Sequence, residues 1–179
     1  MKIICLGDSF TEGFLVEDKV YTRFLSKAGF DIINLGRNGS TTEEMLRRFK
    51  AYNRVGSEAD MLIVFGGTND FIGGSSPQLV FKNLKSIVDL SDVRYKLVIL
   101  PPFVEEEEAY PIYEQINSKI LAFKTLIKDW GITYIDGEEI PGHYLDGVHM
   151  ASDFHENLAM KIIEKIGGKD GIDRKRDSR

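Results

Sequence analysis

One serine near the start of the chain has the position that a nucleophile would need. Ser9 follows the apolar run of residues 3–6, which is typical of a short β-strand, and the residues after it are polar and turn-like. The hydroxyl would therefore lie at the carboxyl end of a strand, where open α/β sheets bind their ligands. Serine is also a common turn residue, so its position alone is weak evidence for catalysis. A catalytic serine also requires a base, an acceptor that orients the base, and donors for an oxyanion.

The base is sought among three histidines, and one of them has an acid at a suitable spacing. His149 comes three residues after Asp146, and a single helical-type turn would put both side chains on the same side. Asp146 would then accept a hydrogen bond from one imidazole nitrogen and leave the other to take the proton of Ser9. His143 lacks an acid at that spacing. His155 falls in the first turn of an expected helix, where a packing or capping role suffices.

Donors for a developing oxyanion are available in three segments. They are the backbone N–H of Ser9, the backbone N–H of Gly39 and the side-chain amide of Asn69. Glycine suits such a loop because it lets the backbone approach a ligand closely. Gly39 and the pair Asn69-Asp70 would also serve as ordinary turn residues, so no donor is persuasive when taken alone.

The elements that must position these residues alternate between strand and helix patterns. Such alternation predicts an α/β fold with βαβ units and a five-stranded, mainly parallel sheet in flavodoxin-like order, with helices on both faces. The expected strands are Ile3–Leu6, Asp31–Leu35, Met61–Phe65, Tyr95–Leu100 and Ile132–Ile135. The expected helices cover residues 21–28, a segment capped by Thr41 and Glu44, a segment begun by Ser76-Pro77, residues 113–130, and a last helix capped by Asp153 and Glu156.

Right-handed crossovers place all strand-to-helix loops of such a sheet on one edge. We therefore expect Ser9, Gly39, Asn69 and the loop of residues 136–150 to meet there. The second strand and the third each end in glycines just before a helix, which favours an edge built for close approach to a ligand.

Length and charge limit the classes of protein. The 179 residues suit one domain, expected over residues 1–166, and the charged residues 167–179 are expected to be a disordered tail. A net charge of −5 without a basic stripe argues against nucleic acid as a partner. No stretch is apolar over the roughly 20 residues that a membrane span needs. No signal peptide is visible, which favours the cytoplasm, and the sequence indicates no oligomeric state.

Two features that could suggest metal or redox chemistry have simpler explanations. Cys5 is the single cysteine and lies in the first apolar run, so a buried structural thiol is expected. The acidic run Glu105–Glu108 lacks the alternating spacing of a calcium loop and is interpreted as a solvated loop.

Four ordered blocks of the sequence resemble those of the SGNH, or GDSL, hydrolase family. The resemblance spans residues 3 to about 160, and Phe10 stands where the family motif has leucine. The blocks are Gly7-Asp8-Ser9-Phe10, Gly39, Gly67-Thr68-Asn69-Asp70 and Asp146-Gly147-Val148-His149.

This resemblance implies a role for each candidate. Ser9 would be the nucleophile, His149 the general base and Asp146 its orienter, with Gly39 and Asn69 as oxyanion donors beside the Ser9 amide. Gly36 could also fill the glycine block, and Gly39 is chosen because it directly precedes a Ser-Thr pair and a helix, as in the family. The resemblance also implies a three-layer α/β/α sandwich and no metal or cofactor.

The expected activity is hydrolysis of small-molecule carboxylic esters with short to medium acyl chains, through an acyl-enzyme on Ser9. Short loops offer no lid, which argues against a long-chain lipase. Asp8 is expected to shape the turn that presents Ser9. Two alternatives remain: a carbohydrate O-acetylesterase of the same family, and a non-catalytic flavodoxin-like binding module. Five apolar residues could form walls of the site or equally pack in the core or in loops: Phe10, Phe71, Ile72, Pro102 and Phe103.

Overall fold

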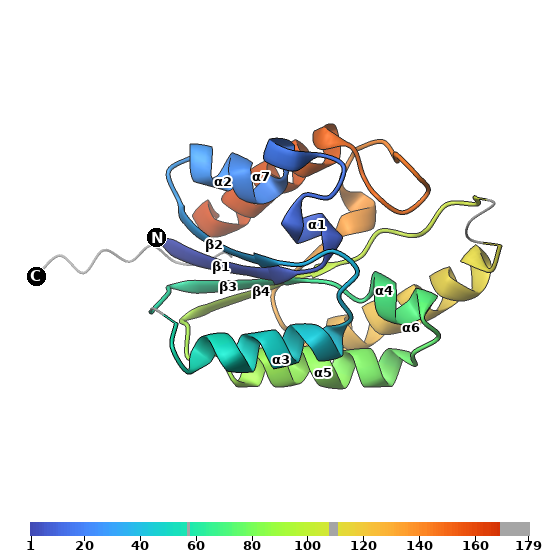
Figure 1. The fold of residues 1–179 in the computed structure, drawn as a ribbon, viewed down its shortest axis with the longest axis horizontal. Helices are drawn as coiled ribbons and strands as arrows, with labels where there is room; N and C mark the ends of the chain where they lie inside the picture. The colour runs from blue at the N-terminus through green and yellow to red at the C-terminus, as the bar shows by residue number, and fades with distance from the viewer. Residues whose placement is uncertain (57, 108–110, 169–179) are drawn as a thin grey trace, which may run out of the picture.

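A five-stranded sheet runs through the centre of the computed structural model, which describes residues 1–56, 58–107 and 111–168 (Figure 1). Neighbouring strands are all parallel, and their order is β2-β1-β3-β4-β5. The expected parallel sheet in flavodoxin-like order is thus confirmed. The strands are β1 (Lys2–Gly7), β2 (Asp31–Gly36), β3 (Met61–Phe65), β4 (Tyr95–Leu100) and β5 (Tyr134–Asp136).

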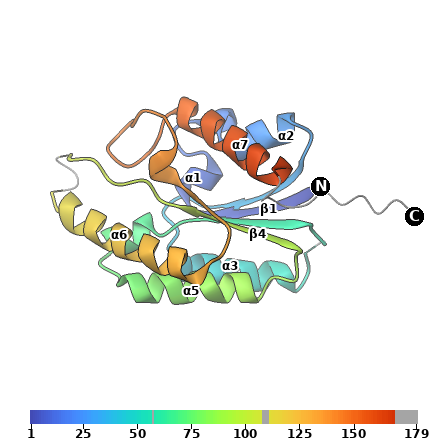
Figure 2. The same ribbon diagram turned by 180° about the vertical axis from the view of Figure 1, so that it is seen from behind.

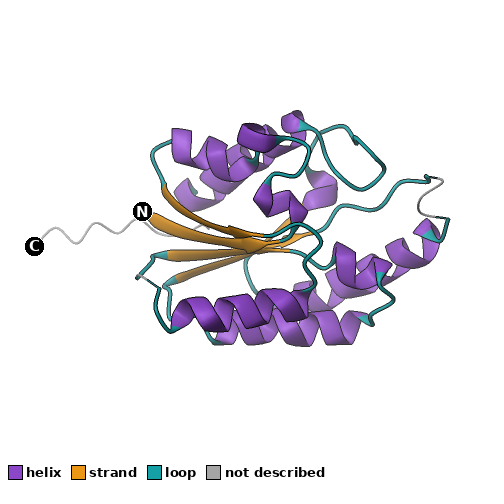
Figure 3. Ribbon diagram, in the orientation of Figure 1, coloured by secondary structure: helices purple, strands orange, loops and turns teal. Residues whose placement is uncertain are grey.

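Helices cover both faces of this sheet and give the expected three layers (Figures 1 and 2). One layer contains α2 (Tyr21–Lys27) and α7 (Ser152–Gly167), and the other contains α3 (Thr42–Asn53), α5 (Pro77–Asp89) and α6 (Tyr113–Trp130). Four shorter helical segments lie in the connections between these elements (Figure 3). They are α1 (Ser9–Glu12), η1 (Glu17–Lys19), α4 (Thr68–Ile72) and η2 (Gly137–Glu139).

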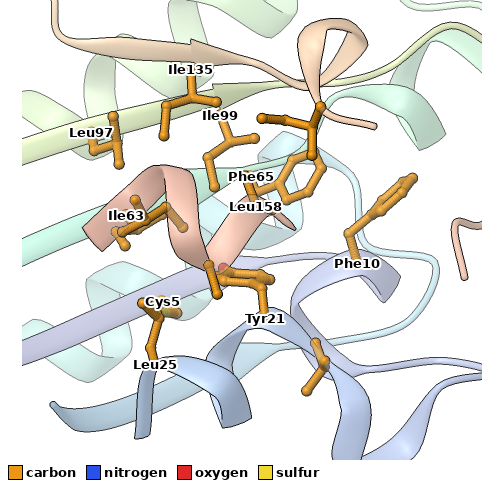
Figure 4. Packing of buried hydrophobic residues seen from close by; sticks show 14 of the residues in the cluster. Cys5, Phe10, Tyr21, Leu25, Ile63, Phe65, Leu97, Ile99, Ile135 and Leu158 are labelled. Atoms are coloured by element: carbon orange, nitrogen blue, oxygen red, sulfur yellow. The ribbon is translucent and has the colours of Figure 1, made fainter. Parts of the chain in front are cut away.

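The sheet is apolar on both faces because successive side chains of a strand point in opposite directions. In β1, Ile3 and Cys5 pack toward α2 and α7, whereas Ile4 and Leu6 pack toward α3 and α5. Figure 4 shows Cys5 within the first of these two cores, near Leu25 of α2. Complete burial raises the pKa of the Cys5 thiol to about 12, which fits the expected structural role.

Local signals in the sequence located most helix ends. Thr41 and Glu44 form the expected capping box of α3, and the Ser76 hydroxyl accepts from the backbone of Leu79 at the start of α5. Gly131 ends α6 in the left-handed conformation that glycine favours.

Two element boundaries were predicted wrongly. Strand β5 begins at Tyr134, two residues later than expected, because only its three residues align with β4 at the edge of the sheet. Helix α7 begins at Ser152, and Asp153 does not cap it; Ala151 is the N-cap residue, and no side chain there accepts a hydrogen bond. The Asp153 carboxylate is instead engaged by the side chain of His143.

Parts of two expectations fall outside the described residues. Glu105–Glu107 are exposed, as a solvated loop requires, while Glu108 and most of the expected tail, residues 169–179, are not described. Across the described ranges, no helix is both long and apolar enough to cross a membrane.

A close approach between β2 and α1 yields a prediction about stability. A Cβ added at Gly36 would lie 2.5 Å from the backbone carbonyl carbon of Thr11, so Gly36→Ala forces the two segments apart. We expect the free energy of unfolding to fall by roughly 1–3 kcal/mol, measured by urea denaturation. Gly167→Ala is the matched control, because a Cβ there meets no atom within 4 Å. Equal midpoints for native protein and Gly36→Ala would contradict this packing.

Candidate active site

Ser9 lies where β1 gives way to the first turn of α1. The Asp8 carboxylate accepts a hydrogen bond from the Phe10 N–H at 3.1 Å and so caps this turn, as expected. Ser9 itself is only 4% exposed. The hydroxyl is therefore held at the carboxyl end of a central strand by a short, capped turn.

A chain of two hydrogen bonds connects Ser9 to His149 and Asp146. His149 Nε2 lies 3.1 Å from Ser9 Oγ, and His149 Nδ1 lies 2.7 Å from Asp146 Oδ2. The three side chains thus come together in the order that the sequence suggested. This arrangement can take a proton from the serine hydroxyl and stabilise the imidazolium that results.

The turn that carries this pair differs from the expected helical-type turn. Asp146 Oδ1 accepts hydrogen bonds from the backbone N–H groups of Val148 and His149, so a side chain closes the turn. Gly147 has φ +73°, which lies outside the helical region. Partial burial opposes ionisation of Asp146, but the hydrogen bonds from His149 outweigh it and hold its pKa below the usual value.

Residues 143–151, which we call the His149 hairpin, are fastened by backbone contacts. Tyr144 and Met150 form an antiparallel bridge, and the Leu145 N–H donates to the His149 carbonyl at 2.7 Å. The Tyr144 hydroxyl donates to the carbonyl of Phe103, in the loop after β4, at 2.6 Å. The hairpin is therefore anchored both to itself and to the neighbouring loop.

The two loops expected to supply oxyanion donors are joined to each other. The Asn69 side-chain amide, on α4, donates to the Ser40 carbonyl at 3.1 Å, and Gly39 directly precedes Ser40. An amide NH₂ group has two hydrogens, so one N–H of Asn69 is not used by this bond. Among the described residues, no backbone hydrogen bond outside the regular elements uses the N–H of Ser9 or Gly39.

Sequence reasoning missed Arg48, which connects three segments of the site. Its guanidinium donates to the Gly7 carbonyl at 2.7 Å, to the Ser40 hydroxyl at 3.1 Å and to the Leu35 carbonyl at 3.0 Å. Arg48 thereby ties the ends of β1 and β2 to the loop that contains Gly39. No spacing in the sequence pointed to it, because its partners are mainly backbone carbonyls from separate segments.

Asp70 fixes the position of its neighbour Asn69. Its carboxylate accepts from the Thr42 N–H at 2.8 Å and from the Thr42 hydroxyl at 2.7 Å, so α4 is bound to the start of α3. Burial raises the pKa of Asp70, which these hydrogen bonds partly offset. The sequence signal that could have indicated this role is the position of Asp70 beside Asn69 in the block Gly67-Thr68-Asn69-Asp70.

The other two histidines have different surroundings. His143 Nδ1 lies 2.5 Å from Asp153 Oδ2, so its acidic partner comes from ten residues later in the chain. His155 is buried against Tyr21 and Phe154, and burial lowers its pKa to about 4. This confirms the packing interpretation of His155.

Two of the five candidate wall residues belong to the core. Phe10 is stacked on Phe65 with ring centroids 4.8 Å apart, and Phe71 packs against Phe123. Both are almost fully buried, which agrees with the core-packing alternative, and the Phe10 ring also lies 6.1 Å from the His149 imidazole between centroids. Within the described part of the chain, no three His, Cys, Asp or Glu side chains are grouped closely enough to hold a metal ion.

Asp8 carries a carboxylate oxygen that has no partner. The residue is fully buried, and its Oδ2 makes no hydrogen bond to the described residues. Burial raises the pKa of Asp8 to about 7; the Phe10 N–H and the Arg48 charge favour its ionised form, and the Asp70 charge opposes it.

This raised pKa predicts a pH dependence of stability. The native state binds more protons than the unfolded state between the usual Asp pKa of 3.8 and about 7, so the stabilising contribution is lost as pH rises through this range. We expect Asp8→Asn, which keeps the capping oxygen, to reduce this loss by an amount on the order of a few kcal/mol. Urea midpoints at pH 5 and pH 8 measure it. Parallel pH dependence in both proteins would contradict the prediction, and Asp18→Asn, at an exposed position, controls for the loss of one charge.

Comparison with known proteins supports the resemblance noted in the sequence. The sequence model of the GDSL-like lipase/acylhydrolase family matches residues 5–158. A search of curated proteins gives no match.

Solved structures share the fold at low sequence identity. An aryl esterase from M. smegmatis has 19% identity and a TM-score of 0.77, covering 92% of this chain and 97% of its own. A carbohydrate acetylesterase family member from Sinorhizobium meliloti has 18% identity and a TM-score of 0.75, covering 91% and 97%. A lipolytic protein of the G-D-S-L family from Veillonella parvula has 18% identity and a TM-score of 0.76, covering 92% and 97%. Given the family match over most of its length, the chain belongs to the GDSL-like lipase/acylhydrolase family.

Proposed function

We propose that this protein hydrolyses carboxylic esters of short to medium acyl chains, with Ser9 as nucleophile. The observation that carries the proposal is the linked pair of hydrogen bonds, 3.1 Å from Ser9 to His149 and 2.7 Å from His149 to Asp146. A neutral imidazole held by a carboxylate on one nitrogen can act as a base through the other.

In the proposed acylation step, Ser9 Oγ forms a bond to the ester carbonyl carbon while His149 Nε2 takes the hydroxyl proton. The tetrahedral intermediate then collapses, the bond to the alcohol oxygen breaks, and His149 gives its proton to the leaving alcohol. Water repeats the sequence on the acyl-enzyme, releases the acid and restores Ser9. Asp146 keeps its negative charge throughout and stabilises the imidazolium.

The negative charge of each intermediate would be met by three donors. They are the backbone N–H groups of Ser9 and Gly39 and the remaining amide N–H of Asn69. Donors that are already fixed cost no reorganisation when the charge develops, and the contacts of Arg48 and Asp70 hold their segments.

A second candidate within the same chemistry is a carbohydrate O-acetylesterase. It is favoured by the structural likeness to a carbohydrate acetylesterase family member, which shares the fold over nearly its whole length. Hydrolysis of p-nitrophenyl acyl esters, compared with release of acetate from acetylated xylan, separates the two activities.

The nucleophile is tested by Ser9→Ala. We expect its turnover of p-nitrophenyl acetate to fall by roughly 10³-fold or more, because serine and base act as one unit. Ser26→Ala, an exposed serine of α2, is the matched control and should keep native activity.

A fluorophosphonate probe tests the same residue without a substrate. Mass spectrometry should find the label on Ser9 in the native protein and none on Ser9→Ala. An unlabelled native protein would overturn the proposal and favour a non-catalytic binding module.

The oxyanion donor is tested by Asn69→Ala. The loss of one donor should lower kcat by about 10²–10³-fold with little change in KM, because the interaction is made mainly in the transition state. Asn83→Ala is the control, since it removes an amide that donates to Thr42 close to the site. Equal kcat values for Asn69→Ala and native protein would exclude Asn69 as a donor.

A further inference from the structure

Exposed apolar side chains lie in the loop after α1 and in the His149 hairpin. The ring of Phe14, just after α1, lies 4.9 Å from the His149 imidazole between centroids. Phe14 is 38% exposed, Leu15 is 53% exposed and Leu145 is 50% exposed. Side chains of this kind usually reach the surface singly, so three of them in two adjoining segments require an explanation.

The register of the His149 hairpin puts Leu145 on the same face as His149. Tyr144 pairs with Met150, so Leu145 and His149 are the next opposed pair, and opposed residues of an antiparallel pair share a face. Met150 is buried in the core and Tyr144 is half-buried, so their face points inward. Leu145 and His149 consequently share the opposite face, on which Leu145 is exposed and the His149 side chain is largely covered.

A hollow of about 320 Å³ lies between the hairpin and the loop after α1. Leu15 and Val16 line it from the loop, and Leu145 and Ala151 line it from the hairpin. Glu17, Asp18 and Lys19 of η1 line it as well, together with Ser152. The size suits a small organic group, and the four apolar side chains offer contacts to an alkyl or aryl one.

The backbone that presents this surface is strained. Leu15 has φ +65° and Glu17 has φ +49°, a region that side-chain-bearing residues rarely adopt. Strain of this kind persists where the surrounding structure imposes it, often at ligand-binding sites. Here it accompanies the outward display of a leucine beside the hollow.

The proposed reaction determines which part of an ester would occupy this position. His149 must reach both Ser9 Oγ and the oxygen of the departing alcohol, so the alcohol lies on the His149 side of the serine. The oxyanion donors lie on other loops, those of Gly39 and Asn69. We infer that the hollow lined by Leu15 and Leu145 binds the alcohol part of the ester, and that these two leucines favour an alkyl or aryl alcohol. The inference rests on the proposed function.

Alkyl acetates of increasing alcohol length test the inference at constant acyl group and similar leaving-group reactivity. From ethyl to butyl to hexyl acetate, kcat/KM should rise by roughly tenfold or more, because each buried methylene can contribute about fourfold. In the double variant Leu15→Ser/Leu145→Ser this rise should disappear, so that kcat/KM for hexyl acetate falls to about the value for ethyl acetate. Phe14 is left unchanged because it contacts His149.

Two comparisons test whether the effect is specific to these two leucines and to the alcohol part of the ester. Leu121→Ser, an exposed leucine on α6, should keep the full dependence on alcohol length. The dependence of kcat/KM on acid length, measured with ethyl esters of acetic, butanoic and hexanoic acid, should be the same in native and double-variant protein. A double variant that loses the dependence on acid length instead, or that keeps the dependence on alcohol length, overturns the inference.

Binding of 1-hexanol gives a readout that needs no catalysis and no variant. In methyl-labelled native protein, 1-hexanol should shift the NMR signals of Leu15 and Leu145 and leave Leu121 unchanged. Shifts in a protein that hydrolyses no ester would support an apolar ligand site while the proposed function fails. Absence of shifts overturns the inference even where esters are hydrolysed.

Discussion

The hydrogen bond between Ser9 and His149 joins residues 140 positions apart, so it depends on contacts that hold two distant segments together. Ser9 follows a strand next to one edge of the sheet, whereas His149 follows the strand at the opposite edge. The connection from β5 must therefore extend back past the ends of β4 and β3. It is held there by bonds to the loop after β4, from the Tyr144 hydroxyl to the Phe103 carbonyl and from the Glu105 N–H to the Gly147 carbonyl.

Several buried charged groups lie at the carboxyl ends of the strands, where the candidate site is. Lys124 and Asp136 form an ion pair of 2.7 Å at the end of β5, with both side chains almost fully covered. A buried pair stabilises little by itself, since desolvation offsets most of the attraction, but it favours one arrangement of the segments that it joins. Arg48 does the same for the ends of β1 and β2. Asp8, whose buried Oδ2 has no hydrogen-bond partner within the described part of the chain, is locally unfavourable and lies beside the nucleophile.

The groups around Ser9 differ in polarity from one side to the other, which suits ester cleavage. Backbone N–H groups and an amide lie on the loops of Gly39 and Asn69, and the rings of Phe10 and Phe14 lie beside His149. In the proposed reaction, charge develops toward the donors, while a neutral alcohol departs past the histidine. The polar loops thus suit the charge of the intermediate, and the apolar rings suit the departing alcohol.

The sequence by itself determined the five strands, the long helices and the candidates for the site, because hydrophobic period, caps and short motifs are local properties. It could not place β5 or the start of α7 correctly, since strand pairing at an edge and the bond from His143 to Asp153 depend on distant residues. It also could not show Arg48 as a tie between segments, or Phe14 as the neighbour of His149. Only the tertiary structure decided these, because each contact joins segments that the sheet order brings together, and one sequence read in order carries no record of that proximity.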